Sequence, residues 1–341
     1  MRLAVIGGGS WGTALALVLA PRFDAVTLWV NEPDLALRMQ ATRVNHVFLP
    51  GAILPAGIAV ENSLEAALAG ADIVLSVMPS HVARDVYTRM LPFIPPGASL
   101  VSASKGLEAG TLLRMSQVIR SVTGPAFRIA VLSGPTFATE VAAGNPTAVV
   151  VASEDAALAG EIQTLFSGPA FRLYASSDPV GVEIGGALKN VIAIGAGISD
   201  GMNLGHNAVA ALITRGLAEL TRLAVALGAL PETLAGLAGL GDLVLTCTGD
   251  LSRNRQVGMR LAAGLGLSEI LGGSPMVAEG VKTTAVALEL AAHHGVNLPI
   301  AQEMHAVLRG ERTPAEAIHN LMSRTLRVET ESGPGRSRNY S

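Results

Sequence analysis

The sequence has few of the residues that several classes of protein require. Its one cysteine, Cys247, rules out an internal disulfide and a cysteine-rich metal site. Charged residues make up only 15% of the chain and aromatic residues 4%, which excludes long disordered charged tracts. The 24 basic and 27 acidic residues give a net charge of −3, so no basic excess indicates binding to nucleic acid or acidic membranes. We expect a cytoplasmic protein from a reducing compartment.

Histidines are also sparse, and their spacing argues against a metal site. None of them forms an H-E-x-x-H pattern or another ligand spacing. His293 and His294 are adjacent, so on a helix they point about 100° apart and chelate one ion poorly. We predict no metal.

An uncharged stretch, residues 3–20, is long enough to imitate a signal peptide or a membrane span. Three consecutive glycines, residues 7–9, interrupt it where such a segment has to be helical. We therefore expect no membrane insertion.

The pattern along the chain divides it into two domains and a tail. Up to Asp178, short apolar strands alternate with helical segments, which predicts a doubly wound α/β domain over residues 1–178. After Asp178 the segments are long, helical and rich in Ala, Leu and Gly, so residues 179–327 are expected to be all-helical. The polar residues 328–341 are expected to form a disordered tail.

A glycine-rich motif directly follows the first predicted strand. Gly7, Gly9 and Gly12 satisfy G-x-G-x-x-G at the start of a helix. Gly7 allows the tight turn, Gly9 lets a pyrophosphate approach the backbone, and Gly12 lets the helix pack on the strand. The helix N-terminus then faces the phosphates with free N–H groups, which predicts a dinucleotide site.

The end of the second predicted strand does not settle which dinucleotide binds. An acidic residue there favours NAD, and a cation favours the 2′-phosphate of NADP. Asn31 suits either cofactor, whereas Glu32 favours NAD if it points inward.

Two polar segments follow later strands of the predicted sheet. Lys105 lies in a Ser-Lys-Gly turn, and residues 133–137 read Ser-Gly-Pro-Thr-Phe. Both therefore lie at carboxyl ends of strands, where open α/β sheets bind ligands. Lys105 is suited to a phosphate or a polarised carbonyl, but a solvated loop lysine is the equally simple alternative.

Two further polar clusters interrupt apolar sequence in the second domain. Lys189 lies among small and apolar residues, where burial would lower its pKa toward neutrality and suit it to proton exchange. It is equally compatible with a lysine whose stem reaches to water. Asp242 could hold a lysine ammonium, Ser252 resembles a helix N-cap, and Arg253 is suited to a phosphate.

Taken in order, these motifs identify a family. They are G-x-G-S-W-G-T-A at residues 7–14, L-W at 28–29, S-K-G at 104–106, S-G-P-T-F-A at 133–138, L-K-N at 188–190, G-L-G-D-L at 239–243, T-C-T at 246–248, S-R-N at 252–254 and V-A-E-G at 277–280. The chain resembles the bacterial NAD(P)-dependent glycerol-3-phosphate dehydrogenases over residues 1 to about 325. That resemblance implies a Rossmann-type doubly wound sheet followed by an all-α domain of the 6-phosphogluconate dehydrogenase type.

The resemblance also implies an activity and a set of site residues. The activity is reversible reduction of dihydroxyacetone phosphate to sn-glycerol 3-phosphate with NADPH or NADH, and Lys189 is the implied proton donor and acceptor. The implied substrate site comprises Lys105, Gly134, Thr136, Lys189, Asp242, Ser252, Arg253 and Asn254. The implied cofactor site comprises Gly7, Gly9, Ser10, Trp11, Gly12, Asn31, Lys105, Ala138, Arg253, Val277 and Glu279.

Two positions depart from the family pattern. Asn31 replaces the Arg or His of many bacterial relatives, which leaves the usual NADPH preference open. His206 replaces an asparagine, and we interpret it as a tolerated polar residue in a loop.

Two other functions fit the same sequence features. The alternatives are a hydroxy-acid reductase of the same two-domain architecture, similar to 3-hydroxyisobutyrate dehydrogenase, and a non-catalytic nucleotide-sensing module. The apolar helices of the second domain favour a homodimer.

Overall fold

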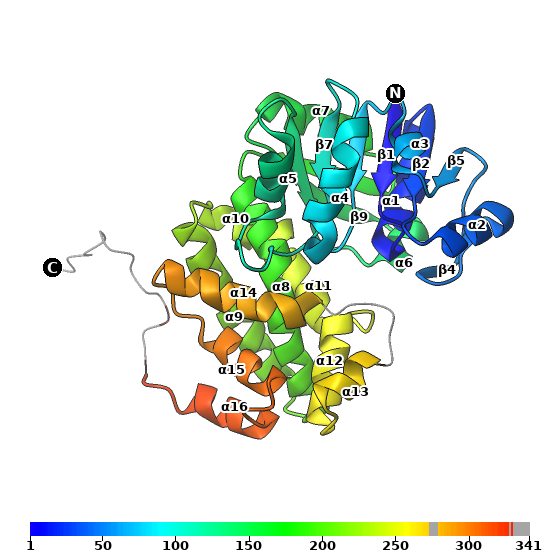
Figure 1. Ribbon diagram of the computed structural model, residues 1–341. Helices are drawn as coiled ribbons and strands as arrows, with labels where there is room; N and C mark the ends of the chain where they lie inside the picture. The colour runs from blue at the N-terminus through cyan, green and yellow to red at the C-terminus, as the bar shows by residue number, and fades with distance from the viewer. Residues whose placement is uncertain (273–278, 327–328, 330–341) are drawn as a thin grey trace.

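In the computed structural model, which describes residues 1–272, 279–326 and 329, an eight-stranded sheet takes up the N-terminal half of the chain (Figure 1). All neighbouring strands are parallel except β8 and β9, which run antiparallel. In spatial order the strands are β10 (Phe171–Ser176), β9 (Thr147–Ala152), β8 (Ile129–Ser133), β7 (Ser99–Ser102), β6 (Ile73–Ser76), β1 (Arg2–Ile6), β2 (Ala25–Trp29) and β5 (Ile58–Glu61).

Helices cover both faces of this sheet. Alternate residues of β1 point to opposite faces: Leu3 and Val5 join a core with α1 and α7, while Ala4 and Ile6 join another with α3, α4 and α5. The predicted doubly wound α/β domain is therefore confirmed. Its helices are α1 (Ser10–Leu19), α2 (Pro33–Thr42), α3 (Leu64–Leu68), α4 (Ala83–Met90), α5 (Met115–Thr123), α6 (Ala138–Ala142) and α7 (Ala156–Phe166), and a hairpin of β3 (Val44–Asn45) and β4 (Leu49–Ile53) follows α2.

The C-terminal part of the chain is helical, as predicted. Its centre is α8 (Pro179–Gly201), which lies beneath the sheet in Figure 1 with the other helices packed around it. These are α9 (His206–Ala226), α10 (Pro231–Ala235), α11 (Asp242–Thr248), α12 (Arg253–Ala262), α13 (Leu267–Gly272), α14 (Glu279–His293), α15 (Pro299–Leu308) and α16 (Pro314–Met322).

By length and composition, helix α8 could cross a membrane. It is the one helix among the described residues of which this is true. However, 94% of its most apolar window is buried inside the fold, so α8 is the core of the helical domain. The uncharged stretch at residues 3–20 instead divides into β1, a glycine loop and α1.

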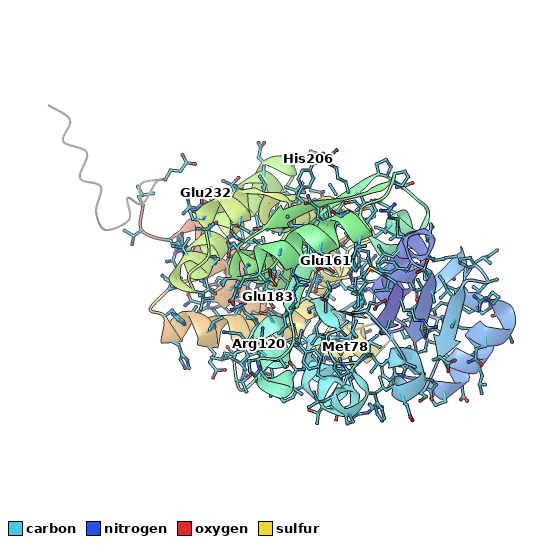
Figure 2. All side chains as sticks on the ribbon, turned by 90° about the horizontal axis from the view of Figure 1, so that it is seen from above. Met78, Arg120, Glu161, Glu183, His206 and Glu232 are labelled. Atoms are coloured by element: carbon cyan, nitrogen blue, oxygen red, sulfur yellow. The ribbon has the colours of Figure 1, made fainter. Side chains whose placement is uncertain are left out.

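One local expectation was wrong. His206 does not lie in a loop but begins α9, because Gly205 ends the preceding turn with a φ of 82°. In the view from above, His206 lies at the rim of the molecule (Figure 2), and its side chain is exposed. The predicted tail, residues 328–341, lies outside the described residues except for Glu329.

Candidate active site

The glycine loop between β1 and α1 leaves a helix N-terminus open to a ligand. Gly7 has a φ of 128°, and an added Cβ there would lie 2.8 Å from Val77 O. A Cβ on Gly12 would lie 1.9 Å from Gly7 O, whereas a Cβ on Gly9 would meet no atom within 4 Å. Helix α1 has no side-chain cap and no acidic residue in its first turn. Its first N–H groups are therefore available to an anion at the open side of Gly9.

A buried asparagine, Asn45, holds this loop in place. The Asn45 amide donates to Gly8 O (2.8 Å) and to Thr13 Oγ1 (2.9 Å), and Asn45 is fully buried. It therefore ties the β3–β4 hairpin to both ends of the glycine turn. No local pattern marks this role, because the partners are more than 30 residues away.

Two lysines meet one carboxylate at the carboxyl edge of the sheet. Lys105 Nζ donates to Asp242 Oδ2 (2.7 Å) and to Gly134 O (3.0 Å), and Thr136 Oγ1 lies 3.5 Å from the same nitrogen. Lys189 Nζ donates to the other oxygen of Asp242, which is fully buried. The structure thus brings together Lys105, Gly134, Thr136, Lys189 and Asp242, five of the eight predicted substrate residues.

Two glycines of α8 allow the close contacts that bring Lys105, Lys189 and Asp242 together. A Cβ on Gly186 would lie 2.5 Å from Ser133 Oγ at the end of β8, so glycine lets α8 approach the sheet without moving that hydroxyl. A Cβ on Gly185 would lie 2.5 Å from Ala238 O, in the π-helical segment Leu237–Gly241 that precedes α11. Asp242, the first residue of α11, is therefore held directly against α8.

The environment of Lys189 suits proton exchange near neutral pH. Burial, reinforced by the ammonium of Lys105, lowers the pKa of Lys189 to about 7, although the carboxylate of Asp242 raises it. An amine with such a pKa both donates and accepts a proton under physiological conditions. The alternative of a lysine that reaches to water is excluded, because the side chain is only 7% exposed.

A second polar group surrounds the start of α12. Ser252 caps this helix by accepting from Arg255 N, as the sequence suggested. Asn254 donates to Asn190 Oδ1 (3.0 Å) and accepts from Gly280 N (3.0 Å), so it links α12 to α8 and α14. The neighbouring Arg253 is exposed.

Glu279, at the start of α14, belongs to the same charged region. Burial raises its pKa to about 7, and the positive charges of Arg253, Lys105 and Lys189 act in the opposite direction. These interactions connect Glu279 electrostatically to both lysines of the site.

The remaining predicted residues are distributed around this centre. Ser10, Trp11 and Ala138 are half-buried at the starts of α1 and α6. Asn31 is exposed just after β2, and the amide of Asn62 donates to its carbonyl. Val277 lies outside the described residues.

The described residues also show where the single cysteine lies and whether side chains cluster as metal ligands. Cys247 is fully buried on α11, and burial raises its pKa to about 12, so it is a thiol rather than a nucleophile. Within the described ranges, no group of three or more His, Cys, Asp or Glu side chains is placed to hold a metal ion.

The residues present fit a nicotinamide dinucleotide. The uncapped start of α1 and the open side of Gly9 suit a pyrophosphate, and buried Trp11 Nε1 has no protein partner. A buried lysine of neutral pKa lies at the same carboxyl edge of the sheet. Fold and site together define a dinucleotide-dependent oxidoreductase with a Rossmann-type domain and a helical domain.

Comparison with known proteins narrows this class to one family. Residues 2–159 match the family model described as the NAD-dependent glycerol-3-phosphate dehydrogenase N-terminus, and residues 178–319 match that of the C-terminus. The chain belongs to the NAD-dependent glycerol-3-phosphate dehydrogenase family.

Individual relatives agree with this assignment over nearly the whole chain. Glycerol-3-phosphate dehydrogenase (NAD(P)+) of Geobacter metallireducens is 57% identical over 330 residues, which cover 96% of this chain and 98% of the relative. The protein of the same name from Koribacter versatilis is 57% identical over 332 residues, with the same coverage. The crystal structure of glycerol-3-phosphate dehydrogenase from Coxiella burnetii superposes with a TM-score of 0.91 at 42% identity, covering 95% of this chain and 99% of that one.

Proposed function

We propose that this chain catalyses the reversible NAD(P)H-dependent reduction of dihydroxyacetone phosphate to sn-glycerol 3-phosphate, which supplies the backbone of glycerophospholipids. The observation that carries the proposal is the buried pair of Lys189 and Asp242, with Lys105 on the second carboxylate oxygen. Support for a proton-donor role comes from the pKa of Lys189, which burial lowers to about 7.

Lys189 is the proton donor in this mechanism. When bound, the reduced nicotinamide supplies a hydride to the carbonyl carbon of the ketone. As negative charge develops on the carbonyl oxygen, Lys189 Nζ gives it a proton, and an O–H bond replaces one N–H bond. Asp242 orients the ammonium throughout, and solvent returns the proton to Lys189 afterwards. In the reverse direction the neutral amine accepts the hydroxyl proton.

The other residues bind and orient. Lys105 is suited to the polar end of the substrate, because its side chain is 14% exposed and its ammonium already faces Gly134 O and Thr136. Arg253 supplies a planar donor for the phosphate, next to Ser252 and Asn254. The glycine turn and the start of α1 would hold the pyrophosphate of the cofactor, and Asn31 would be the residue available to its ribose.

Three further proposals concern the domain boundary, the oligomeric state and the cellular location. We place the functional division of the chain at residue 178, supported by the end of β10 at Ser176 and the start of α8 at Pro179. We propose a homodimer through the helical domain, where Leu204, Val225 and Leu230 are exposed. A cytoplasmic location follows from the single reduced cysteine and the substrate.

The decisive assay follows reduced-nicotinamide absorbance with dihydroxyacetone phosphate, separately with NADH and NADPH. We expect oxidation that requires the phosphorylated ketone and is absent with dihydroxyacetone. The ratio of the rates with NADH and NADPH gives the cofactor preference, which Asn31 leaves open. Turnover of a hydroxy-acid or keto-acid substrate instead would contradict the proposal and keep only the fold.

A further inference from the structure

One loop of the sheet domain is held by the helical domain at both of its ends. Residues 103–114, here the lysine loop, connect β7 to α5. At its beginning Ser104 donates to Met78 O (2.6 Å), and Lys105 pairs with Asp242. At its end Arg114 and the following helix pair with Glu183 of α8.

Glu183 makes an unusually complete set of contacts for a buried carboxylate. It accepts from Ser116 N (2.7 Å), from Ser116 Oγ (2.6 Å) and from the guanidinium of Arg114. Its side chain is 5% exposed, and it lies toward the middle of the molecule (Figure 2). A carboxylate with three donors at the start of α5 fixes that helix end firmly.

Contacts in the middle of the lysine loop connect the start of α5, which Glu183 fixes, to Lys105. Leu107 is bridged to Arg114 as an antiparallel pair and packs in the core of the helical domain beside residues of α8. Glu108 accepts from Arg84 at 2.9 and 2.8 Å. The loop is therefore a short closed unit, so its end at Arg114 and its beginning at Lys105 move together.

We propose that Glu183 is a positioning residue that sets where Lys105 stands relative to Lys189. This inference rests on the proposed function of the two lysines. Glu183 and Lys189 lie on the same helix, six residues or about 9 Å apart along its axis. Helix α8 thus carries the proton donor and also fixes the loop that brings the second cation.

The consequence is a change in the pH profile if Glu183 is altered. The charged or titratable groups that act on Lys189 or respond to it are Asp242 and Cys247 of α11, Lys105 of the lysine loop and Glu279 of α14. Lys105 lowers the pKa of Lys189 and competes for Asp242. A lysine loop that is no longer fixed would remove both effects, so the pKa of Lys189 would rise.

The test compares Glu183→Gln with Glu219→Gln. Glu219 is a matched control, because it is also a buried carboxylate of the helical domain and accepts backbone N–H groups at the start of another helix, from Ile300 and Ala301. We expect Glu183→Gln to lower kcat about tenfold and to move the alkaline limb of ketone reduction to higher pH. Glu219→Gln should leave both unchanged.

A double-mutant cycle shows whether Glu183 acts through Lys105. In a Lys105→Met background, Glu183→Gln should cause no further loss of kcat. Equal losses in both backgrounds, or an unmoved pH profile with only a lower melting temperature, would overturn the proposal. Ser116→Ala, which removes one donor, serves in its place if Glu183→Gln does not fold.

A readout without activity separates this inference from the proposed function. Acetylation of Lys105 by a water-soluble anhydride, followed by peptide mass spectrometry, should be several-fold faster in Glu183→Gln than in wild type and unchanged in Glu219→Gln. Equal rates in all three proteins would refute the positioning role even if wild type reduces the ketone. If Lys105 is labelled faster in Glu183→Gln but wild type does not reduce dihydroxyacetone phosphate, the proposed function is refuted and the positioning role is not.

Discussion

Lys189 of α8 and Asp242 of α11 form an ion pair inside the protein, although the two residues are 53 positions apart in the chain. Asp242 has no exposed surface and Lys189 very little, so water screens their attraction weakly. A buried pair of this kind contributes little net stability, because desolvation offsets the attraction. Its proposed role is to position a proton donor, and the first prediction tests that role.

Ketone reduction should fall above pH 7. The donor must carry its proton, and the pKa of Lys189 is about 7, so kcat should decline up to tenfold per pH unit on the alkaline side. Oxidation of glycerol 3-phosphate should rise through the same range, because it needs the neutral amine. Lys189→Met should lower kcat by 10²–10⁴-fold. Full turnover in that variant would remove Lys189 from the mechanism.

Two glycines of the same loop should respond differently to alanine. Gly9→Ala meets no protein atom within 4 Å, so its melting temperature should equal that of wild type, while the cofactor Kd rises about tenfold or more. Gly12→Ala would place a methyl group 1.9 Å from Gly7 O, so stability should also fall. Thermal unfolding and fluorescence titration with NADH separate the two effects. Equal cofactor Kd in Gly9→Ala and wild type would contradict the site.

Arg253 should control affinity for the phosphorylated substrate. Removing a guanidinium–phosphate contact costs about 2 kcal/mol or more, so Arg253→Ala should raise KM for dihydroxyacetone phosphate at least thirtyfold. Arg260 is a matched control, since it is an exposed arginine in the last turn of the same helix. Steady-state kinetics should show no change in Arg260→Ala, and an unchanged KM in Arg253→Ala would exclude it from the site.

Glu219 should make the stability of the protein depend on pH. Burial raises its pKa to about 7 against an ordinary value of 4.5, so the folded state binds a proton more tightly than the unfolded state does. Its contribution is full below pH 4.5 and is lost as pH rises toward 7, by up to ~1.4 kcal/mol per pH unit. Glu219→Gln should flatten this decline between pH 5 and 7, measured by urea unfolding. Parallel curves for the two proteins would show that Glu219 does not titrate there.

The parts of the fold that local pattern controls were predictable. The alternation of strands and helices up to Asp178 and the helices after it follow from short apolar runs and good helix formers, as in helix α3. Other elements depend on contacts between distant parts of the chain. Helix α11 follows a π-helical segment in which a Cβ on Gly239 would lie 2.0 Å from Leu234 O, and such a contact exists only in the folded chain.

The site was predictable in composition but not in geometry. Motifs identified Lys105, Lys189 and Asp242, yet no spacing shows that both lysines share one carboxylate. Glu183 and Asn45 were not predicted at all. Their partners lie far along the chain, so neither residue carries a local signal.

The shared carboxylate is also made much later than the first lysine that it pairs with. Lys105 leaves the ribosome 137 residues before Asp242. A nascent chain that has completed the sheet and the glycine turn already has its dinucleotide-binding surface, but its lysine has no counter-ion. Truncated or unfinished chains would therefore bind cofactor without turning over substrate, and turnover would require α11 and then the later helices α12 and α14, which carry Arg253 and Glu279, to dock.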